Sequence, residues 1–248
     1  DDVVVEVGAG AGALTSRMGK VARKVFSYEL DETLKKKLDA AVGEMPNVEV
    51  IYRDFLSSRP PKGPFKLVSN VPFGLTSAVL DWVVEARTLT SATLITQLEY
   101  AKKRSGAYGR WSKLTVSTWP FLEWSLRGRI ARTSFRPVPK VDAGILVVER
   151  RSKPLLAGRD VRAWNDLVEL GFSGVGGSLF ASLSRRYPRS RVSAAFAQAG
   201  TAKDAIVAFV SPQEWLQISA VLIGSAPKDS GGAPRPPRSH TRPPRRRP

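Results

Sequence analysis

The fold class follows from one segment near the start of the chain, Val3-Val4-Val5-Glu6-Val7-Gly8-Ala9-Gly10-Ala11-Gly12. Its valine-rich part predicts a buried parallel strand that ends at Gly8, and residues 14–21 predict a short helix after the glycines. Glycines have no side chain, so a loop of them lets backbone N–H groups and a helix N-terminus approach a ligand closely. This order of strand, glycine loop and helix predicts a seat for a nucleotide-like cofactor.

Strands and helices continue to alternate after this first unit. Helices are expected after Asp31 and over 75–85, and the expected strands are 24–29, 48–52, 66–70 and 92–98. Such alternation predicts a parallel, doubly wound sheet, and therefore an α/β, Rossmann-like fold. Two later segments, 124–130 and 145–149, flank a proline-rich stretch and predict a hairpin that closes one edge of the sheet.

The charge of the chain indicates an anionic partner. The 248 residues carry a formal net charge of +17, with a pI near 10.6. Such an excess favours a nucleic acid or an anionic membrane surface as the partner. No apolar run approaches the roughly 18 residues of a membrane span, and residues 1–12 lack a signal-peptide pattern. We therefore expect a cytoplasmic protein with no membrane partner.

Two residue types are scarce, which excludes several kinds of chemistry. The chain has no cysteine, and His240 is its only histidine. A thiol nucleophile, a zinc finger, a zinc deaminase centre and a Ser/His/Asp triad all require residues that are missing. We expect a reaction that runs without these groups and without a metal site.

Candidate cofactor-binding residues follow the first three strands. They are Gly8, Gly10, Gly12, Glu29 and Asp54. An acidic residue at the end of the second strand reaches ribose hydroxyls in such folds, and the next carboxylate could accept a hydrogen bond from an adenine amine of the cofactor. A tight turn, a solvated carboxylate and a cap are the ordinary alternatives. The joint position at the carboxyl ends of strands, where open α/β sheets bind ligands, favours the cofactor.

The fourth strand ends in the most discriminating motif, Asn70-Val71-Pro72-Phe73. The amino nitrogen of adenine is a poor nucleophile because its lone pair is delocalised into the ring. The Asn70 side-chain carbonyl and the Pro72 backbone carbonyl could accept its two hydrogens and favour a pyramidal, attacking nitrogen. Phe73 could stack on the base. The alternative is a strand-terminating turn with Phe73 in the core; the motif favours methyl transfer to adenine.

Cations and aromatic residues gather beyond the fifth strand. Cations neutralise RNA phosphates, and aromatic rings hold unstacked bases of a single-stranded loop. A solvated basic face is the alternative for any one of them. The predicted RNA contacts are Lys102, Lys103, Arg104, Arg110, Lys113, Arg136 and Lys140.

The motifs together resemble the erythromycin-resistance (Erm) rRNA adenine N6-methyltransferases, relatives of the small-subunit rRNA adenine dimethyltransferases. The resemblance covers residues 1–222. It rests on Glu6-Val7-Gly8-Ala9-Gly10-Ala11-Gly12-Ala13-Leu14-Thr15, Tyr28-Glu29-Leu30-Asp31, Asp54, Asn70-Val71-Pro72-Phe73-Gly74-Leu75-Thr76-Ser77, Gln97-Leu98-Glu99-Tyr100-Ala101, Gly109-Arg110-Trp111-Ser112 and Phe135-Arg136-Pro137-Val138-Pro139-Lys140-Val141-Asp142.

This resemblance implies S-adenosylmethionine as the methyl donor, one adenine of large-subunit (23S) rRNA as the target, and resistance to macrolide, lincosamide and streptogramin B antibiotics. It also implies roles for particular residues. Those at Gly8, Gly10, Glu29, Asp54 and Asn70 bind the cofactor. Asn70 and Phe73 serve the target base, which the aromatic ring at Phe135 faces from the other side. We expect a monomer that adds one or two methyl groups.

Three domains are expected on this interpretation. Residues 1–151 form the cofactor-binding catalytic domain, residues 152–224 a helical domain that binds RNA or braces the fold, and residues 225–248 a disordered basic tail. The helices expected in the second are 161–172, 179–186, 191–198 and 212–222.

One departure and three alternatives accompany the resemblance. Members of the family usually begin with a segment upstream of the first strand that helps to wall the cofactor, so a start at Asp1 favours a fragment. A small-subunit dimethyltransferase and a non-catalytic RNA-binding factor on the same fold stay open. A nicotinamide-dependent oxidoreductase stays open too, because Gly8-x-Gly10-x-x-Ala13 meets a permissive dinucleotide fingerprint.

Overall fold

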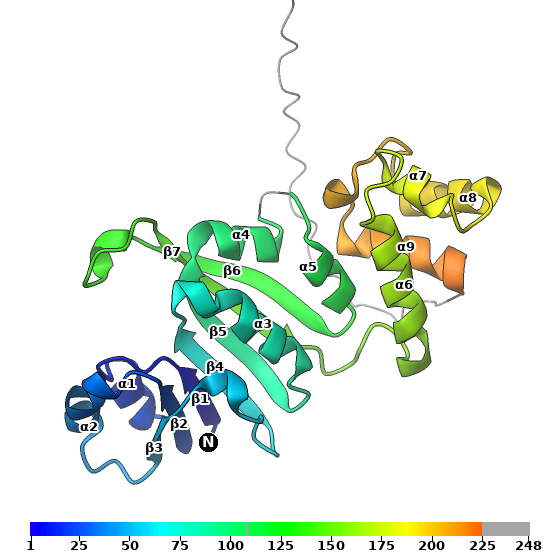
Figure 1. Ribbon diagram of the computed structural model, residues 1–248. Coiled ribbons are helices and arrows are strands. Elements are labelled where there is room, and N and C mark those ends of the chain that lie inside the picture. Colours follow the sequence, from blue (N-terminus) through cyan, green and yellow to red (C-terminus); the bar gives the residue numbers. More distant parts are fainter. Residues whose placement is uncertain (108, 225–248) are drawn as a thin grey trace, which may run out of the picture.

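A seven-stranded sheet forms the centre of the computed structural model, which describes residues 1–107 and 109–224 (Figure 1). The predicted tail, 225–248, lies outside the described residues. The strand order is β3-β2-β1-β4-β5-β7-β6. The strands are β1 (Val3–Val7), β2 (Lys24–Glu29), β3 (Val48–Tyr52), β4 (Phe65–Asn70), β5 (Leu89–Gln97), β6 (Leu122–Ile130) and β7 (Ala143–Arg150).

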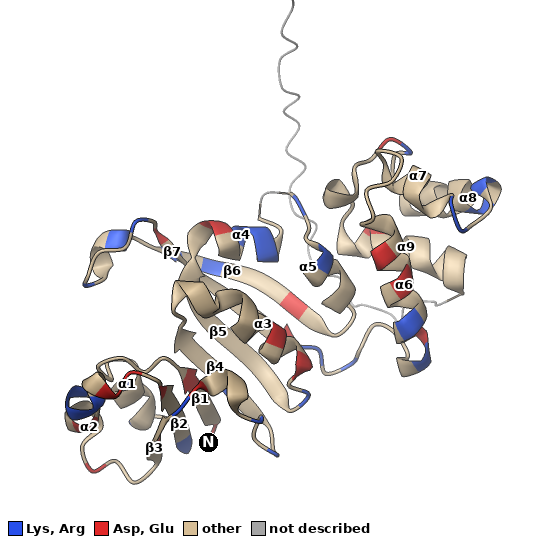
Figure 2. Ribbon diagram, viewed as in Figure 1, with Lys and Arg blue, Asp and Glu red and all other residues tan. Residues whose placement is uncertain are grey.

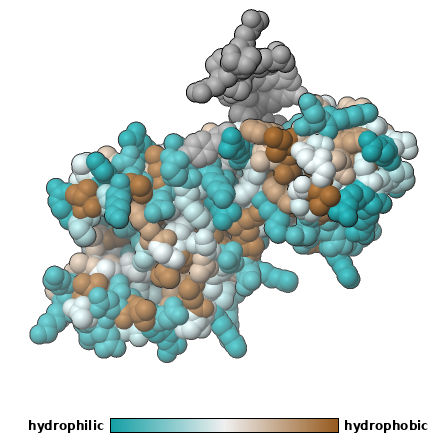
Figure 3. Space-filling model, turned by 45° about the horizontal axis from the view of Figure 1, so that its top comes forward, coloured by the Kyte–Doolittle hydropathy of each residue, from teal (hydrophilic) through white to brown (hydrophobic). Residues whose placement is uncertain are grey.

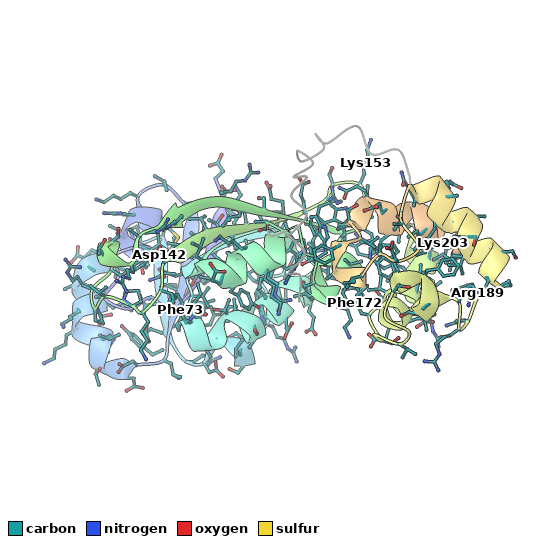
Figure 4. The ribbon with its side chains drawn as sticks, turned by 90° about the horizontal axis from the view of Figure 1, so that it is seen from above. Phe73, Asp142, Lys153, Phe172, Arg189 and Lys203 are labelled. Carbon is teal, nitrogen blue, oxygen red and sulfur yellow. The ribbon has the colours of Figure 1, made fainter. Side chains whose placement is uncertain are left out.

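The strand directions confirm the predicted α/β, Rossmann-like fold. Strands β1 to β5 pair in parallel, whereas β7 pairs antiparallel with both β5 and β6. The predicted late hairpin is therefore β6–β7, and its second strand inserts between β5 and β6. Buried valines and leucines fill the parallel strands because helices cover such a sheet, and Figures 1 and 4 show α3 and α4 on the same face.

The helices follow the expected pattern with two additions. They are α1 (Thr15–Gly19), α2 (Lys35–Val42), α3 (Thr76–Glu85), α4 (Leu98–Ser105), α5 (Lys113–Thr118), α6 (Val161–Gly171), α7 (Leu179–Leu183), α8 (Arg189–Ala199) and α9 (Pro212–Ile223). Helices α4 and α5 were not expected from the sequence. Within the described ranges, none of the helices is long and apolar enough to cross a membrane.

Short 3₁₀ turns precede several of these helices or end strands. They are η1 (Glu32–Leu34), η2 (Phe55–Ser57), η3 (Phe73–Leu75), η4 (Arg132–Ser134), η5 (Gly158–Asp160) and η6 (Val207–Phe209). Three of them, η2, η3 and η4, follow β3, β4 and β6, so they begin at the edge of the sheet where the candidate residues lie.

Helices α6 to α9 form a second group beside the sheet (Figure 1). One apolar cluster runs through both parts, from Leu67 and Leu94 in the sheet to Trp164 and Trp215 in the helices. The indole N–H of Trp164 donates to the Ser117 carbonyl of α5 at 2.9 Å. Helix α5 therefore joins the two parts of the molecule.

Candidate active site

Strand register brings the predicted site residues to one edge of the sheet. Ser69 donates its hydroxyl to the Val7 carbonyl at 2.6 Å, so the ends of β1 and β4 are level. Glu29 pairs with Tyr52 at the end of β3, and Asn70 pairs with Ile95 near the end of β5. The carboxyl ends of β1 to β5 therefore meet, as expected for ligand binding in an open α/β sheet.

The glycine loop after β1 touches the motif after β4. Gly8, Gly10 and Gly12 have φ values of 71°, 60° and 84°, which side chains rarely adopt. A Cβ built on Gly8 would lie 3.1 Å from the ring carbons of Pro72. A Cβ on Gly10 would meet nothing within 4 Å, so this part of the loop borders open space. Glycine at position 8 thus permits the close approach of two motifs that are far apart in sequence.

Glu29 binds the glycine loop and the residues after β2 through its carboxylate. The carboxylate is 8% exposed and accepts three backbone N–H groups. Its Oε2 accepts from Gly10 at 2.7 Å, and its Oε1 accepts from Leu30 and Asp31 at 2.8 Å each. A carboxylate has about four acceptor positions, so one is left for a ligand hydroxyl. The structure therefore gives Glu29 a structural role that the sequence did not indicate, and leaves room for the predicted one.

A buried polar network underlies the same loop. Glu6 is 1% exposed, and its Oε2 accepts hydrogen bonds of 2.6 Å from the hydroxyls of Thr15 and Ser27. Burial raises the pKa of the Glu6 carboxyl above its ordinary value, although the two hydroxyls act in the opposite direction. This network ties the start of α1 to β1 and β2, and so fixes the helix end that faces the loop.

Asp54 lies at the end of β3 and caps η2. Its Oδ1 accepts a hydrogen bond of 3.0 Å from the backbone N–H of Leu56, which is the ordinary capping role. Phe55 behind it packs edge-on against Tyr28 at 5.3 Å between ring centroids. The carboxylate itself is exposed at the ligand-binding edge of the sheet.

Asn70, Pro72 and Phe73 present their polar and aromatic groups at the surface. The Asn70 amide is exposed and makes no hydrogen bond with another described residue. The Pro72 carbonyl accepts the N–H of Leu75 at 2.8 Å, which leaves its second lone pair available. Phe73 is half-buried and belongs to none of the apolar clusters of the described residues. The alternative of a core phenylalanine is therefore excluded.

The β6–β7 hairpin reaches the same edge. Asp142 organises it: Oδ1 accepts the Arg132 N–H at 2.9 Å, and Oδ2 accepts the Arg129 Nε–H at 2.8 Å. These donors hold the pKa of the Asp142 carboxyl below its ordinary value. Phe135, at the end of η4, is half-buried. Figure 4 shows Phe73 and Asp142 at the end of the sheet away from the helical part.

A cavity of about 280 Å³ opens at the base of this hairpin. Apolar and charged side chains line it, and the backbone N–H of Leu98 donates to the Asp142 carbonyl at its edge at 2.9 Å. The lining residues are Leu98, Glu99, Arg132, Lys140, Val141 and Asp142.

Two groups of the predicted RNA contacts lie at this edge. Lys102 and Lys103 are on α4, where Figure 2 shows basic residues, and Lys102 pairs with Glu99 at 3.2 Å. Arg136 and Lys140 are exposed on the hairpin, where Arg136 donates to the Phe135 carbonyl at 2.9 Å.

The other three predicted contacts occupy different surroundings. Arg104 is half-buried and donates to Tyr100 and Ser112 at 3.2 Å each, so its guanidinium braces α4 against the start of α5. Lys113 forms an ion pair of 2.8 Å with Glu169 of α6. Arg110 is exposed beside the helical part.

Sequence reasoning missed two residues that shape the site. Glu6 is a lone carboxylate among four valines, and an isolated polar residue in a buried strand is a signal of a buried network. Asp142 was noticed only within a longer motif. Its role depends on Arg129 and Arg132 folding back across the hairpin, which spacing alone does not show.

A parallel sheet with one antiparallel strand near its edge, a glycine loop after β1 and an acidic residue at the end of β2 define the class of Rossmann-like methyltransferases. The family model "Ribosomal RNA adenine dimethylase" matches residues 1–223, and the chain belongs to this family. Family and fold imply S-adenosylmethionine as the cofactor, and ribosomal RNA is the substrate class that the family name states.

Three known proteins show how near the likeness is. The rRNA adenine N-6-methyltransferase of Saccharopolyspora erythraea is 49% identical over 215 residues, which are 87% of this chain and 56% of that protein. Mycinamicin-resistance protein MyrB of Micromonospora griseorubida is 39% identical over 191 residues, 77% of this chain and 60% of that protein. The crystal structure of 23S rRNA methyltransferase ErmE superimposes with a TM-score of 0.87 at 48% identity, over 90% of this chain and 91% of that one.

The chain thus spans little more than half the length of the S. erythraea relative. The predicted resemblance to the Erm methyltransferases is confirmed at the level of family and fold. The roles of single site residues and the predicted domain limits stay predictions.

Proposed function

We propose that this protein transfers a methyl group from S-adenosylmethionine to the N6 atom of one adenine in 23S rRNA, and thereby confers resistance to macrolide, lincosamide and streptogramin B antibiotics. One observation carries the proposal: the glycine loop and the Asn70-Val71-Pro72-Phe73 motif meet at the edge of the sheet, so closely that a Cβ built on Gly8 would lie 3.1 Å from the ring of Pro72. A cofactor seat and an amine-binding motif in contact place donor and acceptor next to each other.

The residues around the loop fit the cofactor. The N–H groups of Gly8, Ala9, Gly10 and Gly12 all donate within the protein, so the loop serves the ligand by close approach of its backbone. The open space at Gly10, the free acceptor position on Glu29 and the exposed carboxylate of Asp54 suit a methionine end, a ribose and an adenine amine. S-Adenosylmethionine supplies an electrophilic methyl group on a sulfonium. Gly8, Gly10, Gly12, Glu29, Asp54 and Asn70 would hold it.

The target amine is activated by acceptors rather than by a base. Hydrogen bonds from the amine to the Asn70 side-chain oxygen and to the second lone pair of the Pro72 carbonyl favour the pyramidal nitrogen of the transition state. Phe73, which is half-buried and outside the apolar clusters, stacks on one face of the base, and Phe135 from the hairpin faces it from the other side. The base leaves its stack at a cost of a few kcal/mol, which is smallest for a loop adenine.

The basic residues of α4 and the hairpin would hold the RNA around this pocket. Lys102, Lys103, Arg136 and Lys140 lie at the same edge as Phe135, where phosphates on either side of the target nucleotide would pass. We propose that a monomer acts on rRNA in the cytoplasm, on protein-free or assembling large-subunit rRNA.

The test uses the purified chain, labelled S-adenosylmethionine and protein-free 23S rRNA, with primer extension to locate the methylated base. A stop at one loop adenine is expected. Asn70→Ala should lower kcat by about 100-fold or more, as removal of one preorganised hydrogen-bonding group does elsewhere, while RNA binding is retained. Asn165→Ala, at an exposed position on α6, is the matched control and should leave kcat unchanged.

Other outcomes point to the remaining candidates. Methylation of adjacent adenines in 16S rather than 23S rRNA would assign the small-subunit activity. RNA binding without methyl transfer in the wild-type chain would assign a non-catalytic role. If Asn70→Ala kept the wild-type kcat, the proposed activation of the amine by the Asn70 side-chain oxygen would be wrong.

A further inference from the structure

An exposed aromatic ring and an exposed cation meet where the sheet part joins the helical part. The guanidinium carbon of Arg110 lies 5.3 Å from the ring centroid of Phe209. Phe209, in η6, is 52% exposed, and Arg110 is exposed as well. The residues just before α5 lie against η6, which belongs to the orange-brown turn in Figure 1. Neither segment alone indicates this pair.

The backbone around the pair is fixed. The N–H of Trp111, next to Arg110, donates to the Ala208 carbonyl, next to Phe209, at 2.7 Å. The Trp111 ring covers Gly106 so closely that a Cβ added there would clash with the ring. Trp111 also packs edge-on against Trp119 at 5.7 Å between ring centroids. The two exposed side chains therefore project from a rigid junction, which lowers the entropy lost when a ligand binds them.

The surface around the pair suits a nucleotide better than a protein. Only Ile206, 54% exposed, adds a second large apolar residue in this turn, and Figure 3 shows exposed hydrophobic residues as small separate areas. A specific protein interface needs an area of about 1,000 Å² or more. One unpaired base needs a single aromatic face, and its phosphate needs one cation, which is what the junction offers.

We propose that Phe209 and Arg110 form a second nucleotide-binding site, which stacks an unpaired base of the RNA on the exposed part of the Phe209 ring and pairs the adjoining phosphate with Arg110. The inference rests on the proposed function, since it assumes an RNA substrate with single-stranded nucleotides near the target. It assigns the helical part a direct RNA contact through η6.

The test measures binding of a single-stranded 23S rRNA fragment that contains the target loop, by fluorescence anisotropy over a range of salt concentrations. Phe209→Ala should weaken binding by about 5- to 100-fold with an unchanged salt slope, because stacking is not electrostatic. Phe209→Trp should keep the affinity. Arg110→Ala should weaken binding and reduce the slope of log K against log[salt] by about 0.7, the value for one phosphate contact on a single strand.

Ile206→Ala is the matched control, because it removes an exposed apolar residue of the same turn that has no ring. The RNA affinity of Ile206→Ala should stay within about twofold of that of the wild type. Arg110→Lys should keep the salt slope and lose part of the affinity, since ammonium has no planar face. Methyl-transfer assays should show the Phe209→Ala defect chiefly in KM for RNA.

Two results would overturn the inference. Wild-type affinity in Phe209→Ala would show that the ring binds no base. A concentration-dependent dimer that Phe209→Ala abolishes, with RNA affinity unchanged, would assign the ring to a second copy of the chain. Failure of the proposed function would look different from failure of this inference. In that case the wild-type chain would transfer no methyl group to 23S rRNA, whatever the RNA affinities of the variants.

Discussion

Glycine is required at three loop positions for different physical reasons. Gly8 admits the ring of Pro72, Gly12 admits Ala41 of α2, and Gly10 faces open space. All three have a positive φ that disfavours any side chain. Substitution of Gly12 should therefore affect mainly stability, and substitution of Gly10 mainly cofactor binding. The sequence does not show this difference, because both glycines belong to one motif.

Substitution of Gly12 should cost more stability than substitution of Gly10. Alanine at either position bears about 1–2 kcal/mol of backbone strain. At Gly12 its Cβ would also lie 2.7 Å from the Ala41 Cβ, and overpacking adds about 1–3 kcal/mol. Urea unfolding should show the larger loss for Gly12→Ala. Isothermal titration should show that Gly10→Ala lowers the affinity for S-adenosylmethionine by about tenfold or more. An unchanged affinity would contradict a cofactor-binding site at this loop.

Glu6 should make stability depend on pH in the direction opposite to most carboxylates. Burial raises the pKa of Glu6 in the folded state, so folding favours the protonated carboxyl. The free energy of unfolding should therefore fall as pH rises from the ordinary carboxyl pKa through the raised pKa of the folded state. Glu6→Gln keeps an acceptor for Thr15 and Ser27 but carries no charge. The melting temperature of the variant minus that of wild type should therefore increase between pH 4.5 and 8. A constant difference would contradict the raised pKa.

At the scale of elements, the β6–β7 hairpin carries Phe135 of the proposed pocket, and Asp142 is the anchor of the hairpin. The Asp142 carboxylate accepts from Arg129 and Arg132 on the opposite side of the hairpin. Because Phe135 is the next residue after η4, we expect movement of Arg132 to displace the ring that is proposed to face the base. A shift of about 1 Å at a positioning group can cost up to 100-fold in rate.

Asp142→Asn should lower kcat/KM for RNA by about tenfold. The amide keeps the shape of the carboxylate but loses charge and one acceptor, so it cannot hold both arginine donors. Glu149→Gln is the control, because Glu149 pairs with Arg127 in the same hairpin through an exposed contact of 3.5 Å, and such pairs contribute little. Equal effects of the two substitutions would show that the hairpin needs net charge rather than the Asp142 contacts.

Sequence patterns predicted the elements that bury a continuous apolar face and missed those that do not. The strands β1 to β4 and the helices α6 and α9 agree with the predicted ranges within one residue or two. Helix α4 escaped prediction because Ala101 is its only buried residue, so it has no apolar stripe. The insertion of β7 between β5 and β6 is a matter of topology, which local periodicity does not encode.

The candidate site likewise contains residues that could be placed from the sequence and residues that could not. Residues that follow strands, such as Glu29 and Asn70, could be placed at one edge from the order of strands alone. The bonds of Arg104 to Tyr100 and Ser112 could not be predicted, because they depend on how the start of α5 packs against α4. Long-range contacts such as that of Arg110 with Phe209 carry no signal in one sequence.

At the scale of the whole molecule, the helical part is held to the sheet through α5. Trp164 donates to Ser117, Lys113 pairs with Glu169, and the apolar cluster continues between the two parts. The exposed ion pair contributes little by itself, so packing around Trp164 supplies most of the attachment. A further link between the two parts, from the Trp111 N–H to the Ala208 carbonyl, lies at the junction that presents Arg110 and Phe209.

The sequence beyond the described residues should add affinity for RNA without specificity. Its cations are Lys228, Arg235, Arg238, Arg242, Arg245, Arg246 and Arg247. Each one that neutralises a phosphate of single-stranded RNA adds about 0.7 to the slope of log K against log[salt]. Deletion of 225–248 should therefore weaken binding to 23S rRNA at low salt and flatten the slope.

The site of methylation should not change on deletion, because base contacts and not phosphate contacts select the target. Filter binding between 50 and 200 mM salt gives the slope, and primer extension gives the site. A version with the seven cations replaced by glutamine at full length is the control for chain length. Equal affinity of the deleted and full chains at low salt would show that these cations do not touch RNA, and would leave the binding to the residues of α4, the hairpin and η6.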